Sequence, residues 1–587
     1  MRKTTGLSAL LVYLLALSLG IALCTVESYA LAFREQQQLF IWNAGYISES
    51  LFAVGGFARL TALFIVQFFY CRPLAVLLCA ALCAGIPALL HCSIVPARPA
   101  SWLCSLLTIA PILALIGLNS LHFQYFTALF LVAAALCAFS RIRSGRLPAS
   151  FVLTALLYLL AGPAVLLFAL MLPAAAISRR ESLLPALVAT ATSLLLPLLP
   201  FLAGSTAQPE LLPSFYYEPT GGMPPFIILC HFSIPLLYSA AALLANARGR
   251  ITVTLCTAAC LLASVCLYVC RPRESEQQRD IYRYEYNLVH NRPGEVVKLA
   301  SSKMYRYIDA NYRNLASASQ GRLLEDLFKA RQHSPMTLFY CPEDHSAGLY
   351  LARALFEAGD FAAAQSVAFN ALPVQGGYSP SMLRMLAYIE LLRGNRAVAS
   401  RYIDMLGRTV FYRDDARGLR ALMQDAAGER FENDRRNFDC PESFVLNPVP
   451  YGEIISLAES NPQNDKTVEY ALATMLLSKD FNGIYRFVAA HPRRPGTVLA
   501  VPVQEALVFF SDYYSSTSKE YALAHGLSEE QYAEYSGIDR EWCRGHGVSD
   551  EVFQRFARFK DAYSGSGGAP VSGFETSFWH YLLFVKL

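Results

Sequence analysis

The first 270 residues contain a series of apolar stretches, each close to the length that a helix needs to cross a lipid bilayer. A hydrocarbon core of about 30 Å takes about 20 helical residues, because every backbone N–H and C=O must find its partner inside the segment. Six stretches meet this length directly or nearly so, and a seventh is slightly short. They cover residues 7–29, 74–95, 102–118, 121–139, 183–203, 225–245 and 251–269. The pattern predicts a polytopic helical membrane domain over residues 1–270.

Charged residues are divided very unevenly between this part of the chain and the rest. Residues 1–270 hold thirteen Lys or Arg and six Glu with no Asp, whereas residues 271–587 hold thirty-six basic and thirty-nine acidic residues. A membrane domain joined to a soluble domain has such a composition. The overall charge of +4 is therefore no sign of nucleic-acid binding, and no nucleic-acid partner is expected.

One further apolar stretch, residues 151–177, has Gly162-Pro163 at its centre, which is either a kink in one long span or the turn of a hairpin. Basic residues in short loops stay on the cytoplasmic side, so charge decides between the two. If Gly162-Pro163 forms a turn, ten of the thirteen basic residues of the membrane domain lie on the cytoplasmic side. If the stretch crosses the membrane once, only six lie there. We therefore predict two half-length helices, nine helical segments in total, a cytoplasmic N-terminus and an extracytoplasmic C-terminal half.

This topology predicts a multi-pass membrane protein. The N-terminus also has features of a signal peptide, with MRKTT as the charged region and Ala30-Leu31-Ala32 as the cleavage site. Cleavage there would remove the first helix and leave the sidedness of the remaining chain unchanged.

From residue 271 onward the pattern changes to amphipathic helices, and one pair of segments repeats. LFEAGDFAAAQSV begins at Leu355 and LLRGNRAVASRYI begins at Leu391, so that Gly359 and Gly394 lie 35 residues apart. The pair resembles tetratricopeptide repeats, whose period is about 34 residues. Similar turns occur in VHNRPGEVVKLAS and LLSKDFNGIYRFV. The alternative is an irregular α-helical domain.

The fold class expected from these patterns is all-α, with the membrane domain followed by a soluble, tetratricopeptide-like domain over residues 271–562. Residues 563–573 read as a flexible linker. Residues 574–587 form an aromatic helix that either caps the repeats or rests at the membrane surface. Because a solenoid of this kind usually holds a peptide or another protein, a protein partner is expected on the repeats.

The predicted outer loop at residues 31–73 carries more polar groups than a connection between spans needs. It opens with FREQQQLFIWNAGYISESLF, and after Gly55-Gly56 the stretch FARLTALFIVQFFY predicts an amphipathic helix along the membrane surface. The polar residues assigned to the outer side include Arg34, Glu35, Glu49, Arg59, Arg72, His122 and Glu218. Polar groups are costly near hydrocarbon, so their concentration at one face predicts an outward-opening polar cavity. The alternative is that they solvate loops or reach the headgroups.

This layout resembles the C-type membrane glycosyltransferase superfamily, whose members transfer a sugar from a polyprenyl-phosphate donor at the outer face. Those enzymes place a catalytic Asp or Glu in the first outer loop. The chain is also similar to a family of uncharacterised bacterial multi-spanning proteins with a repeat-containing tail, through the REQQQLF run from Arg34, Gly55-Gly56 and the QFFY run from Gln67. The first resemblance covers about the membrane domain. The second covers most of the chain, and it implies a location in the bacterial inner membrane but no activity.

The superfamily resemblance implies that Glu35 is the general base, a role worth about 10² to 10⁴ in rate. Arg34, Arg59 or Arg72, or a divalent metal such as Mg or Mn, would stabilise the departing lipid phosphate. His122 would add a hydrogen bond, and Glu49 and Glu218 would contact substrate in the same cavity. The superfamily more often has an Asp, commonly in an Asp-Glu pair, and the absence of Asp from this membrane part departs from that pattern.

Alternative roles exist for individual acids and for the whole chain. Glu35 could instead form a structural ion pair with a nearby arginine, or be solvated, and Glu27 is a weaker candidate at the end of the first helix. For the whole chain, one alternative is a transporter with a discontinuous helix at Gly162-Pro163. Another is a non-catalytic scaffold whose repeats hold envelope-assembly partners.

Some chemistries have no support in the sequence. No P-loop, Gly-rich nucleotide fingerprint, HExxH motif or nucleophile elbow is present, which argues against ATP-driven or soluble-hydrolase chemistry. Twelve of the fifteen cysteines lie in the membrane part without a CxxC pair, and we interpret them as packing residues. The other three, Cys341, Cys440 and Cys543, have neither a disulfide pattern nor zinc spacing, so no metal ligands are assigned.

Overall fold

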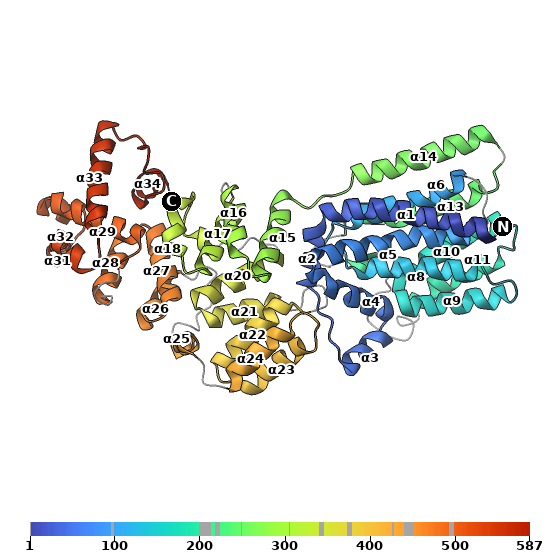
Figure 1. Cartoon of the computed structure of the whole chain (residues 1–587), viewed down its shortest axis with the longest axis horizontal. Coiled ribbons are helices and arrows are strands. Elements are labelled where there is room, and N and C mark those ends of the chain that lie inside the picture. The colour runs from blue at the N-terminus through green and yellow to red at the C-terminus, as the bar shows by residue number, and fades with distance from the viewer. Residues whose placement is uncertain are drawn as a thin grey trace. The chain divides into compact units, whose positions relative to one another are not determined.

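Helices account for the regular structure of this chain in a computed structural model (Figure 1). The structure describes residues 2–94, 99–198, 213–217, 223–247, 249–303, 306–339, 345–371, 378–424, 428–439, 451–491 and 498–586. Within these ranges there is no strand, and one isolated antiparallel bridge joins Leu121 to Tyr217. The all-helical prediction is confirmed for this part of the chain.

The chain divides into two compact units. The first comprises Met1–Tyr282, Pro373–Pro380 and Asp404–Ala416, and the second comprises Arg283–Leu372, Ser381–Ile403 and Arg417–Leu587. The first boundary between the units lies at residue 282, and the composition changes at residue 271. The inclusion of residues 404–416 in the first unit has no counterpart in the sequence pattern.

The first unit is a bundle of apolar helices, in which α1 packs along α5 and α5 packs along α8 (Figure 1). Its helices are α1 (Arg2–Val26), α2 (Ser28–Glu35), α3 (Ala44–Phe52), α4 (Gly56–Val66), η1 (Gln67–Tyr70), α5 (Arg72–Ser93), α6 (Pro99–Leu107), α7 (Ile109–Leu115), α8 (Gln124–Phe139), α9 (Arg146–Ala161), η2 (Gly162–Ala164), α10 (Val165–Arg179), α11 (Leu184–Leu195), η3 (Leu196–Leu198), η4 (Pro213–Tyr216), α13 (Pro225–Leu244) and α14 (Arg250–Val269). A Cβ atom on Gly20 would lie 3.2 Å from that of Ala80, so a small residue lets α1 approach α5 closely.

Five of the described helical stretches are long and apolar enough to cross a membrane, and one of them is interrupted at Gly162. They are Leu7–Val26, Arg72–Ser93, Arg146–Arg179, Pro225–Leu244 and Arg250–Val269. Shorter apolar helices cover Gly56–Tyr70, Ala100–Leu115, Gln124–Phe139 and Leu184–Leu198. The prediction of several membrane-spanning helices therefore stands at five candidates by length and composition, and the predicted count of nine segments is not shown.

The stretch from α9 to α10 reverses direction at its centre. Gly162 ends α9 with a positive φ of 75°, and the Tyr216 hydroxyl binds both sides of the turn, accepting from the amide of Ala164 at 3.1 Å and donating to the carbonyl of Ala161. Arg146, at the start of α9, forms an ion pair with Glu181, which follows α10. Because the two outer ends of the stretch meet, its helices form the hairpin that the charge pattern predicted.

The polar segment after α1 is part of the packed core of the first unit. All residues from Ala30 to Ile41 are buried, and α2 packs against α5 and η1. The stretch expected to lie along the membrane surface forms α4 and η1, and α4 buries one face against α8 and α9. The predicted loop is therefore mostly helical and integrated into the bundle.

The helices from α15 onward are connected mainly by short turns. They are α15 (Glu276–Val289), α16 (Pro293–Ser301), α17 (Tyr307–Ala318), α18 (Leu323–Asp326), η5 (Leu327–Lys329), α19 (Met336–Phe339), α20 (His345–Ala358), α21 (Phe361–Ala371), α22 (Pro380–Leu392), α23 (Arg396–Gly407), α24 (Arg413–Gln424), α25 (Glu429–Arg436), η7 (Asn437–Asp439), α26 (Tyr451–Ser460), α27 (Asp465–Leu477), α28 (Phe481–Ala490), α29 (Val501–Ser516), α30 (Lys519–Ala524), α31 (Glu529–Ser536), α32 (Arg540–Gly545), α33 (Asp550–Gly565) and α34 (Phe578–Phe584).

All four turns predicted between paired helices are present. Each contains a residue with positive φ, namely Asn291, Gly359, Gly394 or Lys479. A left-handed residue just beyond a helix lets the next amides bind the last carbonyls of that helix. At Gly359 a Cβ atom would also collide with Asn437 and Thr467, so glycine is required there. The helix–turn–helix pairs are thus confirmed, and their assignment to tetratricopeptide repeats stays a prediction.

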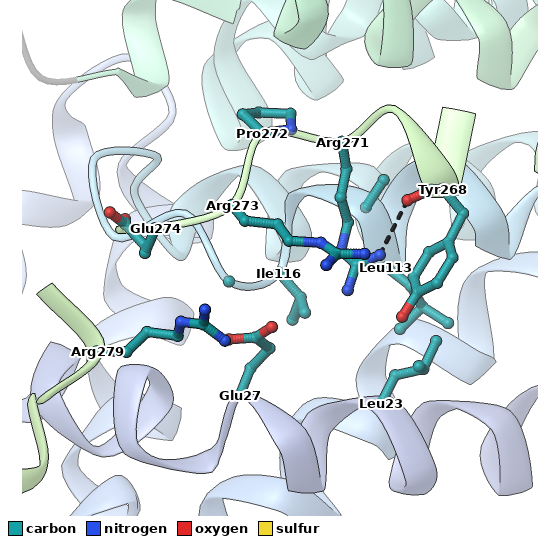
Figure 2. Close-up of a pocket in the computed structure, with 12 residues that line it drawn as sticks. Leu23, Glu27, Leu113, Ile116, Tyr268, Arg271, Pro272, Arg273, Glu274 and Arg279 are labelled. Carbon is teal, nitrogen blue, oxygen red and sulfur yellow. Dashed lines mark hydrogen bonds between the residues drawn. The ribbon is translucent and has the colours of Figure 1, made fainter. Parts of the chain in front are cut away.

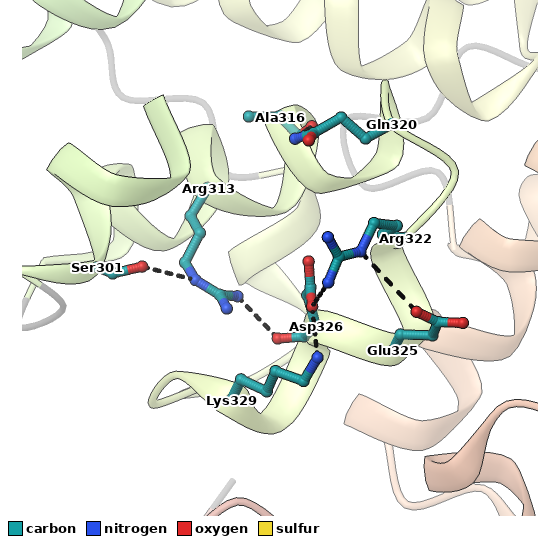
Figure 3. A network of polar contacts seen from close by, with 8 residues as sticks. All are labelled: Ser301, Arg313, Ala316, Gln320, Arg322, Glu325, Asp326 and Lys329. Atoms are coloured by element: carbon teal, nitrogen blue, oxygen red, sulfur yellow. Dashed lines mark hydrogen bonds and ion pairs between the residues drawn. The ribbon is translucent and has the colours of Figure 1, made fainter. Parts of the chain in front are cut away.

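A polar network in the second unit joins α18 to its neighbours (Figure 3). The carboxylate of Asp326 accepts from Lys329 at 2.8 Å and from Arg322 at 3.2 Å. Arg313 donates to the backbone carbonyl of Asp326 at 2.9 Å and to the Ser301 hydroxyl at 3.1 Å. The cations and the acid satisfy one another, so this network stabilises the fold of α16–α18.

The C-terminal aromatic helix packs onto other helices of the second unit. Trp579 is fully buried, and its Nε1 donates to the carbonyl of Glu505 at 2.8 Å. The Tyr581 hydroxyl donates to the carbonyl of Leu477 at 2.7 Å. The helix therefore caps α27 and α29, which is the first of the two predicted arrangements. It is shorter than predicted, and α33 extends to Gly565, into the predicted linker.

Candidate functional site

Glu35 ends α2, and its carboxyl group is buried in a closed polar cluster. The Tyr412 hydroxyl lies 2.9 Å from both carboxyl oxygens, and Nε2 of Gln36 lies 2.5 Å from Oε2. Gln36 also donates to the Tyr412 hydroxyl at 2.9 Å. Tyr412 belongs to residues 404–416, which are part of the first unit. Neither of the two cavities described below is lined by Glu35.

The protonation of Glu35 follows from this burial. Burial raises the pKa of Glu35 from the ordinary 4.5 to about 8, although the hydrogen bonds from Tyr412 and Gln36 favour the ionised form. At neutral pH the folded protein therefore keeps this carboxyl group largely protonated. A general base must be ionised and within reach of the substrate proton. The geometry around Glu35 favours a structural role over the expected catalytic one.

Arg34 is fully buried, and its guanidinium group binds backbone carbonyls. Nη1 donates to Leu121 at 2.7 Å, and Nη2 donates to Leu118 at 2.6 Å and to Ile116 at 3.2 Å. These carbonyls follow the C-terminal end of α7, where the helix dipole favours a cation. Burial lowers the pKa of Arg34 to about 10, which leaves the group charged at neutral pH. Among the described residues, no arginine forms the predicted alternative ion pair with Glu35.

The other predicted site residues, Arg72, Arg59 and His122, lie on different parts of the first unit. Arg72 starts α5, where Nη2 donates to the Ser28 hydroxyl at 3.1 Å and the guanidinium carbon lies 3.7 Å from the centre of the Tyr29 ring. Arg59 is half-buried on α4. Burial, together with the charges of Arg34 and Arg59, lowers the pKa of His122 to about 4, so this histidine is neutral at physiological pH.

The structure brings the predicted site residues together only in part. The backbone amide of His122 donates to the carbonyl of Tyr216 at 2.8 Å, and its buried Nε2 has no hydrogen-bond partner among the described residues. Arg34 and Arg59 affect the titration of His122, but Glu35 faces Tyr412, and Glu49 is exposed on α3. Glu218 lies outside the described residues.

A second polar site lies where α1 ends and the chain leaves α14 (Figure 2). It is a cavity of ≈ 20 Å³, with room for about one water molecule. Its charged lining residues are Glu27, Arg271, Arg273, Glu274 and Arg279, and its other lining residues include Leu23, Leu113, Ile116 and Tyr268. Two acids and three arginines thus meet at the end of two candidate membrane spans.

The arginines of this second site differ in how they are held. Nη1 of Arg271 donates to the carbonyl of Tyr268 at 2.9 Å, and its guanidinium carbon lies 3.8 Å from the centre of that ring. Arg273 and Arg279 are exposed, and Glu274 accepts from the backbone amide of Asn119 at 3.4 Å. Sequence reasoning assigned this region as a domain boundary and missed the site. Its signal is the run Arg271-Pro272-Arg273-Glu274 directly after the last apolar stretch.

Divalent metal was one of the expectations that came with the glycosyltransferase resemblance. Within the part of the chain that the structure describes, no group of three or more His, Cys, Asp or Glu side chains is placed to hold a metal ion. The described residues therefore form no Mg or Mn site with three or more ligands from this chain.

Comparison with known families finds one family that spans nearly the whole chain. A profile described as "Family of unknown function (DUF6057)" matches residues 3–585. The chain belongs to this family. The match covers both units of the chain. No curated protein and no solved structure gives a significant match. The glycosyltransferase-like and tetratricopeptide-like assignments therefore rest on the sequence pattern.

Proposed function

We propose that this protein is a membrane-anchored scaffold. Its apolar helices hold it in the bacterial inner membrane, and its helical domain, a tetratricopeptide-like solenoid on the extracytoplasmic side, binds partners of an envelope-assembly complex. The observation that supports this most is the burial of Glu35 with Gln36 and Tyr412. The acid that best matched a catalytic role is used to hold the chain together.

Other contacts around this cluster support a fixed platform. The Trp42 amide donates to the carbonyl of Arg408 at 3.0 Å, and the Phe411 ring stacks on Tyr70 with 4.9 Å between centres. Residues 404–416 are therefore held by backbone, aromatic and carboxyl contacts at once. These contacts all lie within the first unit, and they fix residues 404–416 in its core.

The scaffold proposal is tested by complementation. In a strain that lacks the chromosomal gene, we expect Glu35→Gln to restore envelope integrity, measured as detergent resistance, because a neutral amide replaces a carboxyl group that is already neutral. Loss of resistance in Glu35→Gln at normal membrane abundance would contradict the proposal.

A glycosyltransferase is the second candidate, and the charged cluster at the end of α1 favours it. The cavity has room for about one water molecule, so substrates would bind at the exposed side of the cluster, where Arg273 and Arg279 lie. We propose for this case that Glu27, rather than Glu35, takes the proton from the hydroxyl group of the acceptor. The oxygen of that hydroxyl group then bonds to the anomeric carbon of the sugar. The bond from that carbon to the lipid phosphate breaks, and Arg273 and Arg279 neutralise the phosphate that leaves. The carboxylate and the arginines line one cavity at the boundary of two candidate spans.

Lipid analysis separates the two candidates. A transferase predicts that polyprenyl-phosphate sugars accumulate in the deletion strain and in Glu27→Gln, as measured by mass spectrometry of lipid extracts. Glu49→Gln is the matched control, because Glu49 is exposed on α3 and lines neither described cavity. Equal lipid pools in all four strains, wild type included, would exclude the transferase and leave the scaffold.

A further inference from the structure

The larger described cavity lies in the second unit, where α28 begins beside α29. Its volume is ≈ 330 Å³, within the range of about 300–1,000 Å³ that small-ligand pockets usually have. It is lined by Lys479, Asp480, Phe481, Asn482, Phe509, Phe510, Tyr513 and Tyr514. Five of these eight residues are aromatic, and the other three are polar. This combination of ring surface with a few polar groups is typical of specific small-ligand sites.

The aromatic wall of this cavity is built mainly by one face of α29. Phe509 and Tyr513 are four residues apart on α29, as are Phe510 and Tyr514. The two side chains of each pair therefore lie next to each other on the helix surface, and the two pairs are neighbours. Phe481 joins them from α28, with its ring centre 5.6 Å from that of Phe509 at an interplanar angle of 23°. Tyr513 is 46% exposed, so part of this ring surface faces solvent and is open to a ligand.

The polar groups lie beside this wall and two of them are fixed. The Asp480 carboxylate accepts from the amide of Gly483 at 2.9 Å, which caps α28. The Lys479 ammonium donates to the carbonyls of Leu582 at 2.8 Å and Val585 at 2.7 Å. Asn482 is exposed at the cavity, where its amide offers both a donor and an acceptor.

We infer that this cavity binds one ring of a sugar. A pyranose has an apolar face of C–H groups that packs on aromatic rings, and hydroxyl groups at its edge that exchange hydrogen bonds with carboxylate, amide and phenol groups. The Phe481 and Tyr513 rings supply the first kind of contact, and Asp480 and Asn482 supply the second. The inference concerns the second unit and holds for either proposed function.

Other ligand classes fit these residues less well. Peptide binding by pairing with a strand edge does not apply to the described residues, because they contain no strand. A helical peptide needs an apolar groove several turns long, whereas this cavity is formed by residues 479–482 and 509–514 alone. An acyl chain needs dry apolar walls, and here Asp480, Asn482 and Lys479 interrupt the lining.

The test uses the full chain in lipid nanodiscs, because detergents with sugar headgroups would compete. Glucose, galactose, mannose, N-acetylglucosamine and cellobiose are screened one at a time by saturation-transfer NMR. We expect at least one to bind, with the strongest transfer to its ring C–H protons. Tyr513→Ala should weaken binding about fivefold to tenfold through loss of ring contact, and Asn482→Ala should weaken it about threefold or more.

Tyr521→Ala is the matched control, since Tyr521 is 53% exposed in the same unit and lies outside the cavity. It should leave sugar binding unchanged, and all three variants should keep the helical circular dichroism of the wild type. The inference is overturned if no sugar binds, or if Tyr513→Ala and Tyr521→Ala bind sugar equally well. Binding of a proline-rich peptide that Tyr513→Ala abolishes, without sugar binding, would assign the cavity to a protein partner instead.

Discussion

The polar segment after α1 and the aromatic cavity beside α28 use their side chains in opposite ways. In the segment, Arg34 and Glu35 are buried and bind backbone carbonyls or Tyr412. In the cavity, Tyr513 is partly exposed beside unburied polar groups. Buried polar groups that find partners contribute to the fold, whereas an exposed ring beside polar groups is available to a ligand. In this chain, the buried charged residues of the apolar half therefore point to a role in stabilising the fold. The exposed aromatic side chains of the polar half point to a role in binding a ligand.

The largest expected effect comes from removing the buried cation of the segment. Arg34→Met should destabilise the protein by about 3–5 kcal/mol, because it leaves the carbonyls of Ile116, Leu118 and Leu121 without their donor in a dry site. The measurement is the midpoint of thermal aggregation in nanodiscs. Arg143→Met, at an exposed arginine of the same unit, is the control and should change stability by less than about 0.5 kcal/mol. Equal midpoints for both variants would mean that the Arg34 contacts contribute nothing to the fold.

The second prediction uses pH to read the state of Glu35. Its pKa of about 8 in the folded protein lies above the ordinary 4.5, so the folded state holds a proton that the unfolded state releases between these values. The stability from this group is full below about pH 4.5 and is lost as pH rises to about 8. We expect wild-type stability to fall relative to Glu35→Gln across this window, by a few kcal/mol in total. Parallel pH profiles for the two proteins would show that Glu35 has an ordinary pKa.

Much of the fold follows from patterns that the sequence displays locally. Apolar length predicts the helices, and charge predicts the hairpin at Gly162. Three of the four turns have Gly or Asn at the position with positive φ, namely Asn291, Gly359 and Gly394, and the fourth has Lys479. Such signals act over a few residues, so they can be read without the rest of the chain. The count of spans is less certain from sequence, because helices shorter than a bilayer also belong to the bundle.

The candidate site was harder to predict because its partners are distant in sequence. Tyr412 lies 377 residues after Glu35, and nothing near either residue indicates that they meet. Arg34 and Glu35 are neighbours in sequence, yet one binds carbonyls after α7 and the other binds Tyr412. The concentration of polar residues at one face therefore predicted a cavity. In the structure, Arg34 and Glu35 instead form hydrogen bonds within the protein.

The third prediction measures the Glu35 cluster through its hydroxyl group. Tyr412→Phe should cost about 1–2 kcal/mol, because it removes a donor to Glu35 and an acceptor for Gln36 while the ring packing remains. Tyr46→Phe is a matched control, since the Tyr46 hydroxyl makes a long contact of 3.4 Å to the carbonyl of Leu39. The control should change the unfolding midpoint by much less than Tyr412→Phe. A reversed order would mean that the cluster around Glu35 is not a stabilising element.

The smallest expected effect concerns the cavity at the end of α1. This cavity shares features with both of the regions compared above. It contains acids and arginines, as a structural cluster would, but Arg273 and Arg279 are exposed. Arg279→Gln should therefore change stability by less than about 0.5 kcal/mol, because an exposed cation gains little from nearby acids in water. Thermal midpoints at low and high salt provide the measurement, and both should match the wild type. A loss of stability above about 1 kcal/mol that does not depend on salt would mean that this cavity stabilises the fold, as the Glu35 cluster does. Stability that is unchanged leaves its charges free for the phosphate of a lipid-linked donor, which is what the second candidate function requires.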